Sequence, residues 1–141
     1  MKYLFRGGTV VSGRGTRRAD ILVEGEKILE VGRNITRKAD QIIDVTGMLL
    51  MPGFIDAHSH LGLDNYGMGY EGQDYNEMGD MVAAQLRGID SFNPQDKAIH
   101  MALSGGVTTV GAGPGSANVL GGTFAVVKTA ASAVAQPGEL F

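Results

Sequence analysis

The feature that most constrains this chain is the apolar run 51–55, which leads directly into Asp56-Ala57-His58-Ser59-His60. A Pro-Gly turn opens the run and strand-forming residues close it, so the segment is predicted to be a buried strand. Side chains alternate faces along a strand, which places Asp56, His58 and His60 on one face. Two imidazoles two residues apart on one face predict a site for a divalent cation.

The identity of the cation follows from the available ligands. Imidazole suits zinc, and it also suits iron, nickel or copper; Zn²⁺ is the first expectation, with Fe, Ni or Mn as alternatives. The chain has no cysteine, which excludes thiolate sites and disulfides and leaves His, carboxylate or carboxylated lysine as ligands. A bare His-x-His also fits two ordinary strand histidines.

The segment Pro52-Gly53-Phe54-Ile55-Asp56-Ala57-His58-Ser59-His60 resembles the first-strand signature of the amidohydrolase superfamily, which comprises metal-dependent hydrolases built on a (β/α)₈ barrel. Residues 20–28 and 43–47 resemble the small β domain that precedes that barrel, and residues 102–110 resemble its second strand. The resemblance covers roughly residues 2–128. Its nearest branch contains imidazolonepropionase-like and dipeptidase-like enzymes.

The resemblance implies an α/β chain in which an all-β domain, a β-sandwich at residues 1–51, precedes a partial TIM barrel at residues 52–128. An atypical Ala-rich tail is expected at 129–141. A complete barrel takes about 250 residues, so a chain of 141 is expected to stop after about two βα units. The family's later-strand positions, a bridging Lys or Glu, two His and an Asp base, find no counterpart here, and the catalytic residues are therefore unknown. Lys128 is interpreted as a strand-end or surface lysine. Asp56 shares the histidine face; in the barrel interpretation it is predicted to orient a ligand or to brace the barrel floor.

The first fifty residues alternate short β-rich runs with turn residues. Gly25-Glu26 separates two of these runs and predicts a tight hairpin. The strands are predicted at 3–5, 9–11, 20–24, 27–31, 42–45 and 48–51.

A segment of about 45 residues, 61–105, separates the two expected barrel strands and is far longer than an ordinary βα connection. Its first part is rich in glycine, tyrosine and acids, and is predicted either to overhang the active site or to be a solvated excursion. In the first case Tyr66 and Tyr70 would contact substrate. The acids lack the spacing of an EF-hand, which argues against calcium.

Two helices are predicted within that segment. Apolar residues between 78 and 89 indicate the first, with Arg87 either facing an anionic substrate group or solvated. Asn93 is predicted to cap the second, with Pro94 at its first position. His100 falls off the apolar stripe of this second helix and is predicted to lie on the surface.

The loop 112–118 after the second expected strand is rich in glycine. In the barrel interpretation Ser116 and Asn118 would lie at the mouth of the site and contact substrate. Such loops can also cradle phosphates, but this one lacks the Gly-Lys-Ser/Thr of a P-loop, which disfavours a nucleotide site.

Charge and hydropathy limit the partners. A formal net charge of −3 without a basic stripe disfavours nucleic acid and anionic membranes. No apolar stretch approaches the roughly 18 residues of a membrane span, and no signal-peptide pattern is visible. A cytoplasmic protein that binds a small-molecule substrate and forms a homo-oligomer is expected.

Two functions follow from the sequence. In the first, the chain is the N-terminal part of an enzyme that hydrolyses C–N bonds of a small cyclic amide or dipeptide-like substrate with metal-activated water. In the second, it is a catalytically inactive, truncated fragment that self-associates through exposed strand edges.

Overall fold

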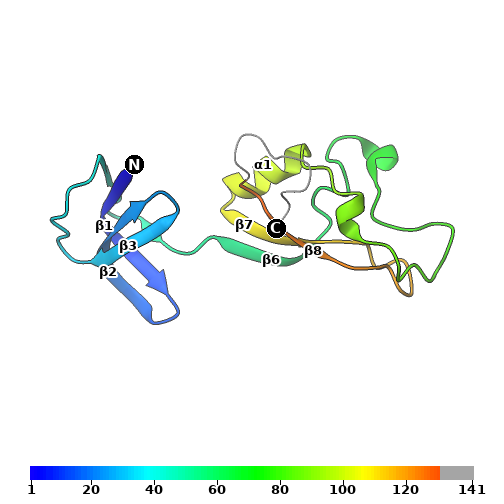
Figure 1. The fold of residues 1–141 in the computed structure, drawn as a ribbon, viewed down its shortest axis with the longest axis horizontal. Helices are drawn as coiled ribbons and strands as arrows, with labels where there is room; N and C mark the ends of the chain where they lie inside the picture. Colours follow the sequence, from blue (N-terminus) through cyan, green and yellow to red (C-terminus); the bar gives the residue numbers. More distant parts are fainter. Residues whose placement is uncertain (131–141) are drawn as a thin grey trace. The chain divides into compact units, whose positions relative to one another are not determined.

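The computed structural model describes residues 1–130, which form two compact units. The first unit is Met1–Pro52 and the second begins at Gly53. Figure 1 shows the strands of the first unit, and the strands and helices of the second. No helix among the described residues has the length and apolar character needed to cross a membrane.

The first unit is a single mixed sheet in the strand order β3-β2-β1-β4. β2 runs antiparallel to both β1 and β3, whereas β4 and β5 pair with β1 in parallel. The two strands expected at 3–5 and 9–11 are one continuous strand whose register shifts between Phe5 and Gly8. The bounds are β1 Lys2–Ser12, β2 Gly15–Glu24, β3 Lys27–Gly32, β4 Gln41–Asp44 and β5 Leu49–Leu50.

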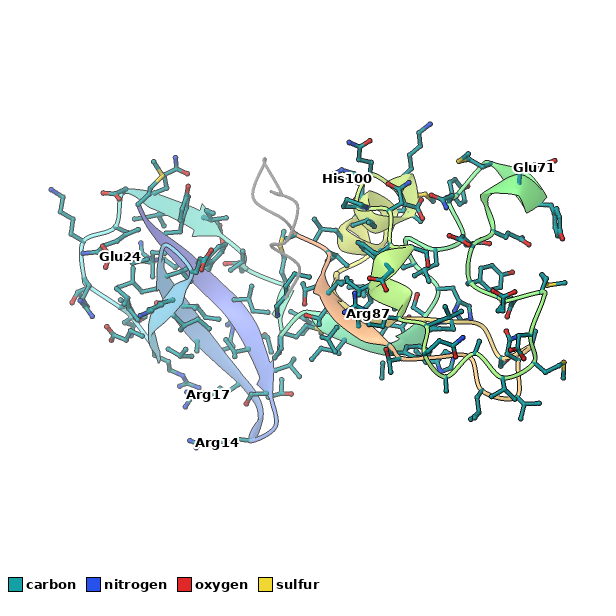
Figure 2. All side chains as sticks on the ribbon, turned by 45° about the vertical axis from the view of Figure 1, so that its right-hand side comes forward. Arg14, Arg17, Glu24, Glu71, Arg87 and His100 are labelled. Carbon is teal, nitrogen blue, oxygen red and sulfur yellow. The ribbon has the colours of Figure 1, made fainter. Side chains whose placement is uncertain are left out.

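A small core holds this sheet together. Leu4 and Leu22 are almost fully buried, and Ile35 packs with them. The predicted hairpin at Gly25 is confirmed: β2 and β3 flank a two-residue turn in which Gly25 adopts a φ of 57°. Arg14 and Arg17 lie at the opposite hairpin, between β1 and β2 (Figure 2). The predicted β-rich first unit is therefore present, and its strands belong to one mixed sheet.

The second unit is built on three strands in the order β6-β7-β8. β6 and β7 are parallel, β7 and β8 are antiparallel, and α1 contacts β7. Val110 and Val127 form the buried core with Leu63 from the long connection. The bounds are β6 Phe54–Ser59, η1 Gly69–Gly72, η2 Gly88–Asp90, α1 Lys97–Ser104, β7 Val107–Ala112 and β8 Ala125–Lys128.

Two details of the helix predictions are wrong. α1 begins at Lys97 and is capped by Asp96, whose side chain accepts from the backbone N–H of Ala98 at 3.0 Å, so Asn93 is not the cap. The helix expected between 78 and 89 does not form. Carboxylates there accept from backbone N–H groups two residues ahead, as Asp80 does from Val82 at 2.9 Å, and such bonds favour turns over helix.

The sheet of the second unit also corrects the expected strand environment. β6 was predicted to be buried, yet every residue from Phe54 to His58 is exposed, because β6 is an edge strand of the described sheet. A portion of a TIM barrel is not evident in residues 1–130, since β8 returns antiparallel to β7 and no helix follows β7 there. The expected tail at 129–141 lies outside the described residues from 131 onward.

The alternation along β8 gives a stability test within one strand. Val127 is 2% exposed and Val126 is 64% exposed. We expect Val127→Ala to lower the free energy of unfolding of the second unit by roughly 2 kcal/mol, because two buried methyl groups are lost. Val126→Ala is expected to change it by less than about 0.5 kcal/mol. Urea denaturation measures both, and an equal loss at the two positions would contradict the described burial.

Candidate functional site

The two histidines of the His-x-His motif lie at the C-terminal end of β6. Their rings stand edge to face with centroids 5.6 Å apart. Such closeness agrees with the prediction that both side chains project from one face of the strand. His58 is exposed and His60 is half-buried.

His60 is held by two groups from distant parts of the chain. Its Nδ1 lies 2.8 Å from the carbonyl oxygen of Gly113, which follows β7. A carbonyl only accepts, so Nδ1 carries the hydrogen, and in the neutral imidazole Nε2 is the nitrogen that has a free lone pair. The ring of Tyr75 stacks on the imidazole with centroids 5.0 Å apart and planes 12° apart. His60 therefore presents one defined nitrogen from a restrained ring.

His58 has a looser environment. Its ring contacts Phe124, with centroids 4.9 Å apart and a tilted geometry. Its backbone N–H donates to Oδ1 of Asp56 at 3.1 Å. The carboxylate of Asp56 is thus engaged with the backbone of its own strand.

The two imidazoles are spaced as two of the ligands of one divalent cation would be. Two imidazoles that bind one tetrahedral ion through nitrogen have ring centres about 5 Å apart, given metal–nitrogen distances of about 2 Å. A metal-binding histidine commonly donates its other ring N–H to a carbonyl or carboxylate, as His60 does to Gly113. Among residues 1–130 no His, Asp or Glu joins the two imidazoles to make a group of three. Other ligands would have to complete the coordination.

A cavity of about 300 Å³ lies beside His60. Tyr66, predicted to contact substrate, lines it together with Tyr75 and the carboxylates Asp64 and Asp96. Tyr70, the other tyrosine predicted to contact substrate, belongs to η1, is 75% exposed and does not line this cavity.

The glycine-rich loop after β7 has structural partners of its own. The side chain of Asn118 donates to the carbonyl oxygens of Glu77 at 2.6 Å and Asp80 at 2.8 Å, so it fastens two loops to one another. Ser116 is exposed and does not line the cavity beside His60. The backbone N–H of Gly115 donates to the Tyr75 carbonyl at 2.6 Å, which removes one donor that a phosphate would need.

Arg87 lines a second cavity, of about 290 Å³, and forms an ion pair there. Its Nε donates to Oδ2 of Asp90 at 2.9 Å, and its Nη2 donates to Oδ1. These hydrogen bonds from the guanidinium lower the pKa of the Asp90 carboxyl and raise the pKa of Arg87. Figure 2 shows Arg87 beside the η2 segment and His100 on the outer side of α1, where the sequence predicts it.

Three contributors to the site escaped the sequence prediction. Tyr75 belongs to a segment noted only for its composition, Gly113 acts through a backbone carbonyl, and Asn93 rather than Asp96 was predicted to cap the helix. No local pattern marks a long-range stacking partner or a carbonyl acceptor. The capping role of Asp96 could have been predicted from its position after Asn93-Pro94, because Asp is a preferred capping residue.

No family model matches this chain. It is 50% identical over 62 residues to the 5-methylthioadenosine/S-adenosylhomocysteine deaminase of Pyrococcus abyssi, which covers 43% of this chain and 15% of the deaminase. It is 38% identical over 63 residues to the D-hydantoinase of Geobacillus stearothermophilus, over 45% of this chain and 13% of that enzyme. The crystal structure of an amidohydrolase from Thermotoga maritima matches with a TM-score of 0.84 and 45% identity, over 92% of this chain and 34% of its own. The matched part of the chain thus spans between 13% and 34% of the length of these relatives.

The Arg87–Asp90 pair gives a titration test. We expect Arg87→Ala to raise the pKa of Asp90 toward its ordinary value, because the donated hydrogen bonds are lost. The stabilisation from this pair is present above the unfolded pKa of Asp90 and disappears as the pH falls through the lower folded value. Carboxyl ¹³C NMR titration measures the pKa. Arg37→Ala, which removes the guanidinium beside Glu30, serves as the control and should leave Asp90 unchanged.

Proposed function

Because this chain belongs to the amidohydrolase superfamily and matches only the N-terminal part of its enzymes, we propose that it carries the first metal-binding strand of a metal-dependent C–N hydrolase. The family is typically metal-dependent. The observation that carries the proposal is the hydrogen bond from His60 Nδ1 to the Gly113 carbonyl, at 2.8 Å. That bond leaves Nε2 free to bind a cation and holds the ring in place.

In this proposal His58 and His60 hold the cation, with Zn²⁺ the first choice and Fe, Ni or Mn the alternatives. A cation held there would supply a Lewis acid that lowers the pKa of a bound water and polarises the carbonyl group of the substrate's C–N bond. The chain's own residues hold and orient the metal-binding imidazole of His60. Gly113 fixes its tautomer, and Tyr75 covers one face of its ring. The acid or base that moves the proton is not assigned to any residue of this chain.

The proposed substrate is a small cyclic amide or a dipeptide-like molecule. The cavity of about 300 Å³ beside His60 suits a small ligand, and Tyr66 and Tyr75 give it an aromatic lining. The relatives include a deaminase and a D-hydantoinase, whose names support an activity at a C–N bond. Tyr66 is the residue we place against the substrate, whereas Tyr70, Ser116 and Asn118 have weaker support from the geometry.

We further propose that β6, α1 and β7 are the first repeat of a TIM-type barrel. Two parallel strands joined through a helix are the unit from which such barrels are built. The histidines lie at the carboxyl end of their strand, where barrel enzymes place catalytic groups.

A second candidate function is self-association without catalysis. Large apolar side chains are exposed on strands of the second unit, with Phe54 at 57%, Ile55 at 72% and Val126 at 64%. β6 is also an edge strand whose outer backbone groups can pair with another chain. Both features favour a homo-oligomer, and together they support this alternative.

Metal content tests the first proposal. We expect close to one metal ion per chain in the purified protein by elemental analysis, Zn²⁺ first and otherwise Fe, Ni or Mn, and loss of that metal in His58→Ala/His60→Ala because both imidazoles are removed. His100→Ala removes the remaining histidine, which is exposed on α1, and should leave the metal content unchanged. Metal-free wild-type protein with a native circular dichroism spectrum would overturn the proposal.

Solution mass tests the second candidate. We expect Ile55→Glu to shift the wild-type oligomer to lower mass in light scattering, since a charge would enter the exposed apolar face of β6. Val119→Glu is the matched control, because Val119 is 68% exposed and lies outside the strands. A monomeric wild-type chain would exclude self-association.

A further inference from the structure

Asp96 is a buried carboxylate placed between α1 and the turn that follows His60. It is 4% exposed and accepts three backbone hydrogen bonds. Oδ2 accepts from Gly62 at 3.2 Å, and Oδ1 accepts from Tyr66 at 3.1 Å and from Ala98 at 3.0 Å. We propose that Asp96 is a positioning residue that fixes the ring of His60 for metal binding. The metal-binding part of this inference rests on the proposed function.

The turn that Asp96 fastens has little freedom to relax. Gly62 adopts a φ of 81°, a conformation that side-chain-bearing residues rarely adopt. A Cβ at this position would lie 2.4 Å from the ring of Phe92, so the backbone passes directly against that ring. The Gly62 carbonyl accepts from Asn93 at 2.8 Å. Both backbone groups of Gly62 are therefore bound to the segment that leads into α1.

The same turn closes onto His60. The His60 carbonyl accepts from the N–H groups of Leu63 at 2.9 Å and Asp64 at 3.1 Å. Gly62 lies between His60 and these donors, so the carboxylate of Asp96 restrains the Leu61–Gly62 peptide unit, which is the next one after the peptide that His60 shares with Leu61. From the opposite side the ring is bound to Gly113. In this proposal Asp96 holds the turn, and the turn holds the backbone of His60 where its ring can reach the Gly113 carbonyl.

A carboxylate is required here by the number of donors. Three N–H groups converge on two oxygens, and an ionised carboxylate is an acceptor at every site. An Asn amide offers one oxygen and directs N–H donors toward backbone donors, so at least one of the three bonds is lost. The carboxylate also lies at the start of α1, where the helix dipole favours negative charge. Asp96 itself occupies this helix end, which leaves no separate anion site there.

The first measurement is made on metal-free, ¹⁵N-labelled protein above the pH at which imidazoles are charged. Side-chain ¹⁵N shifts of His60 report which ring nitrogen carries the hydrogen. We expect wild type to show mainly the Nδ1–H form and Asp96→Ala to show the mixed tautomers of a free imidazole. Asp96→Asn should lie between the two, and it supplies the comparison if Asp96→Ala fails to fold.

The second measurement is Co²⁺ titration of the same proteins, followed by absorption. We expect affinity to fall roughly tenfold in Asp96→Ala, in line with the effect of groups that orient metal ligands, and less in Asp96→Asn. If wild type binds no Co²⁺ while the tautomer still changes, the proposed function fails and the positioning role stands. If wild type binds Co²⁺ and neither readout changes in a folded Asp96 variant, the positioning role fails alone.

Asp20→Asn is the matched control for a loss of stability. Asp20 is 6% exposed and accepts from Gly7 at 2.9 Å and Ile35 at 3.1 Å, but it belongs to the first unit. Its variant should destabilise that unit while leaving the His60 tautomer and the Co²⁺ affinity unchanged. Equal changes in both readouts for the Asp20 and Asp96 variants would overturn the inference.

Discussion

The parallel pairing of β6 with β7 is the constraint on which the second unit depends. Two parallel strands cannot be joined by a tight turn, so the chain must cross from one end of the sheet to the other. It does so through a long loop and α1. The same pairing brings the carboxyl ends of both strands to one edge, which is why His60 meets the carbonyl of Gly113, a residue 53 positions away.

A crossover this long leaves many backbone N–H and C=O groups without strand or helix partners. Polar side chains take their place. Asp96 binds three amides, and Asn118 binds the carbonyls of Glu77 and Asp80. No buried side-chain N or O atom in the described part of the chain is left without a partner. The conformation of the loop is therefore fixed by a few polar contacts and by the burial of Leu63 in the core of the second unit.

The sequence predicted features that depend on local rules and missed those that depend on distant partners. The hairpin at Gly25 and the surface position of His100 follow from turn preference and helical spacing, and both are confirmed. The helix expected near 78–89 failed because side-chain carboxylates satisfy backbone N–H groups there, a competition that apolar spacing does not report. The exposure of β6 could not be read locally, since its strand-like composition does not say how many neighbours it has.

The two imidazoles differ in how strongly their neighbours restrain them. His60 is bound at Nδ1, stacked on Tyr75 and followed by a fastened turn, whereas His58 is exposed and its ring contacts only Phe124 and His60 among the aromatic rings of the described chain. Restraining a free side chain on binding costs about 0.5–1.5 kcal/mol. Most of that cost falls on His58, because His60 is already restrained. Groups that restrict His58 would therefore raise cation affinity more than further contacts to His60.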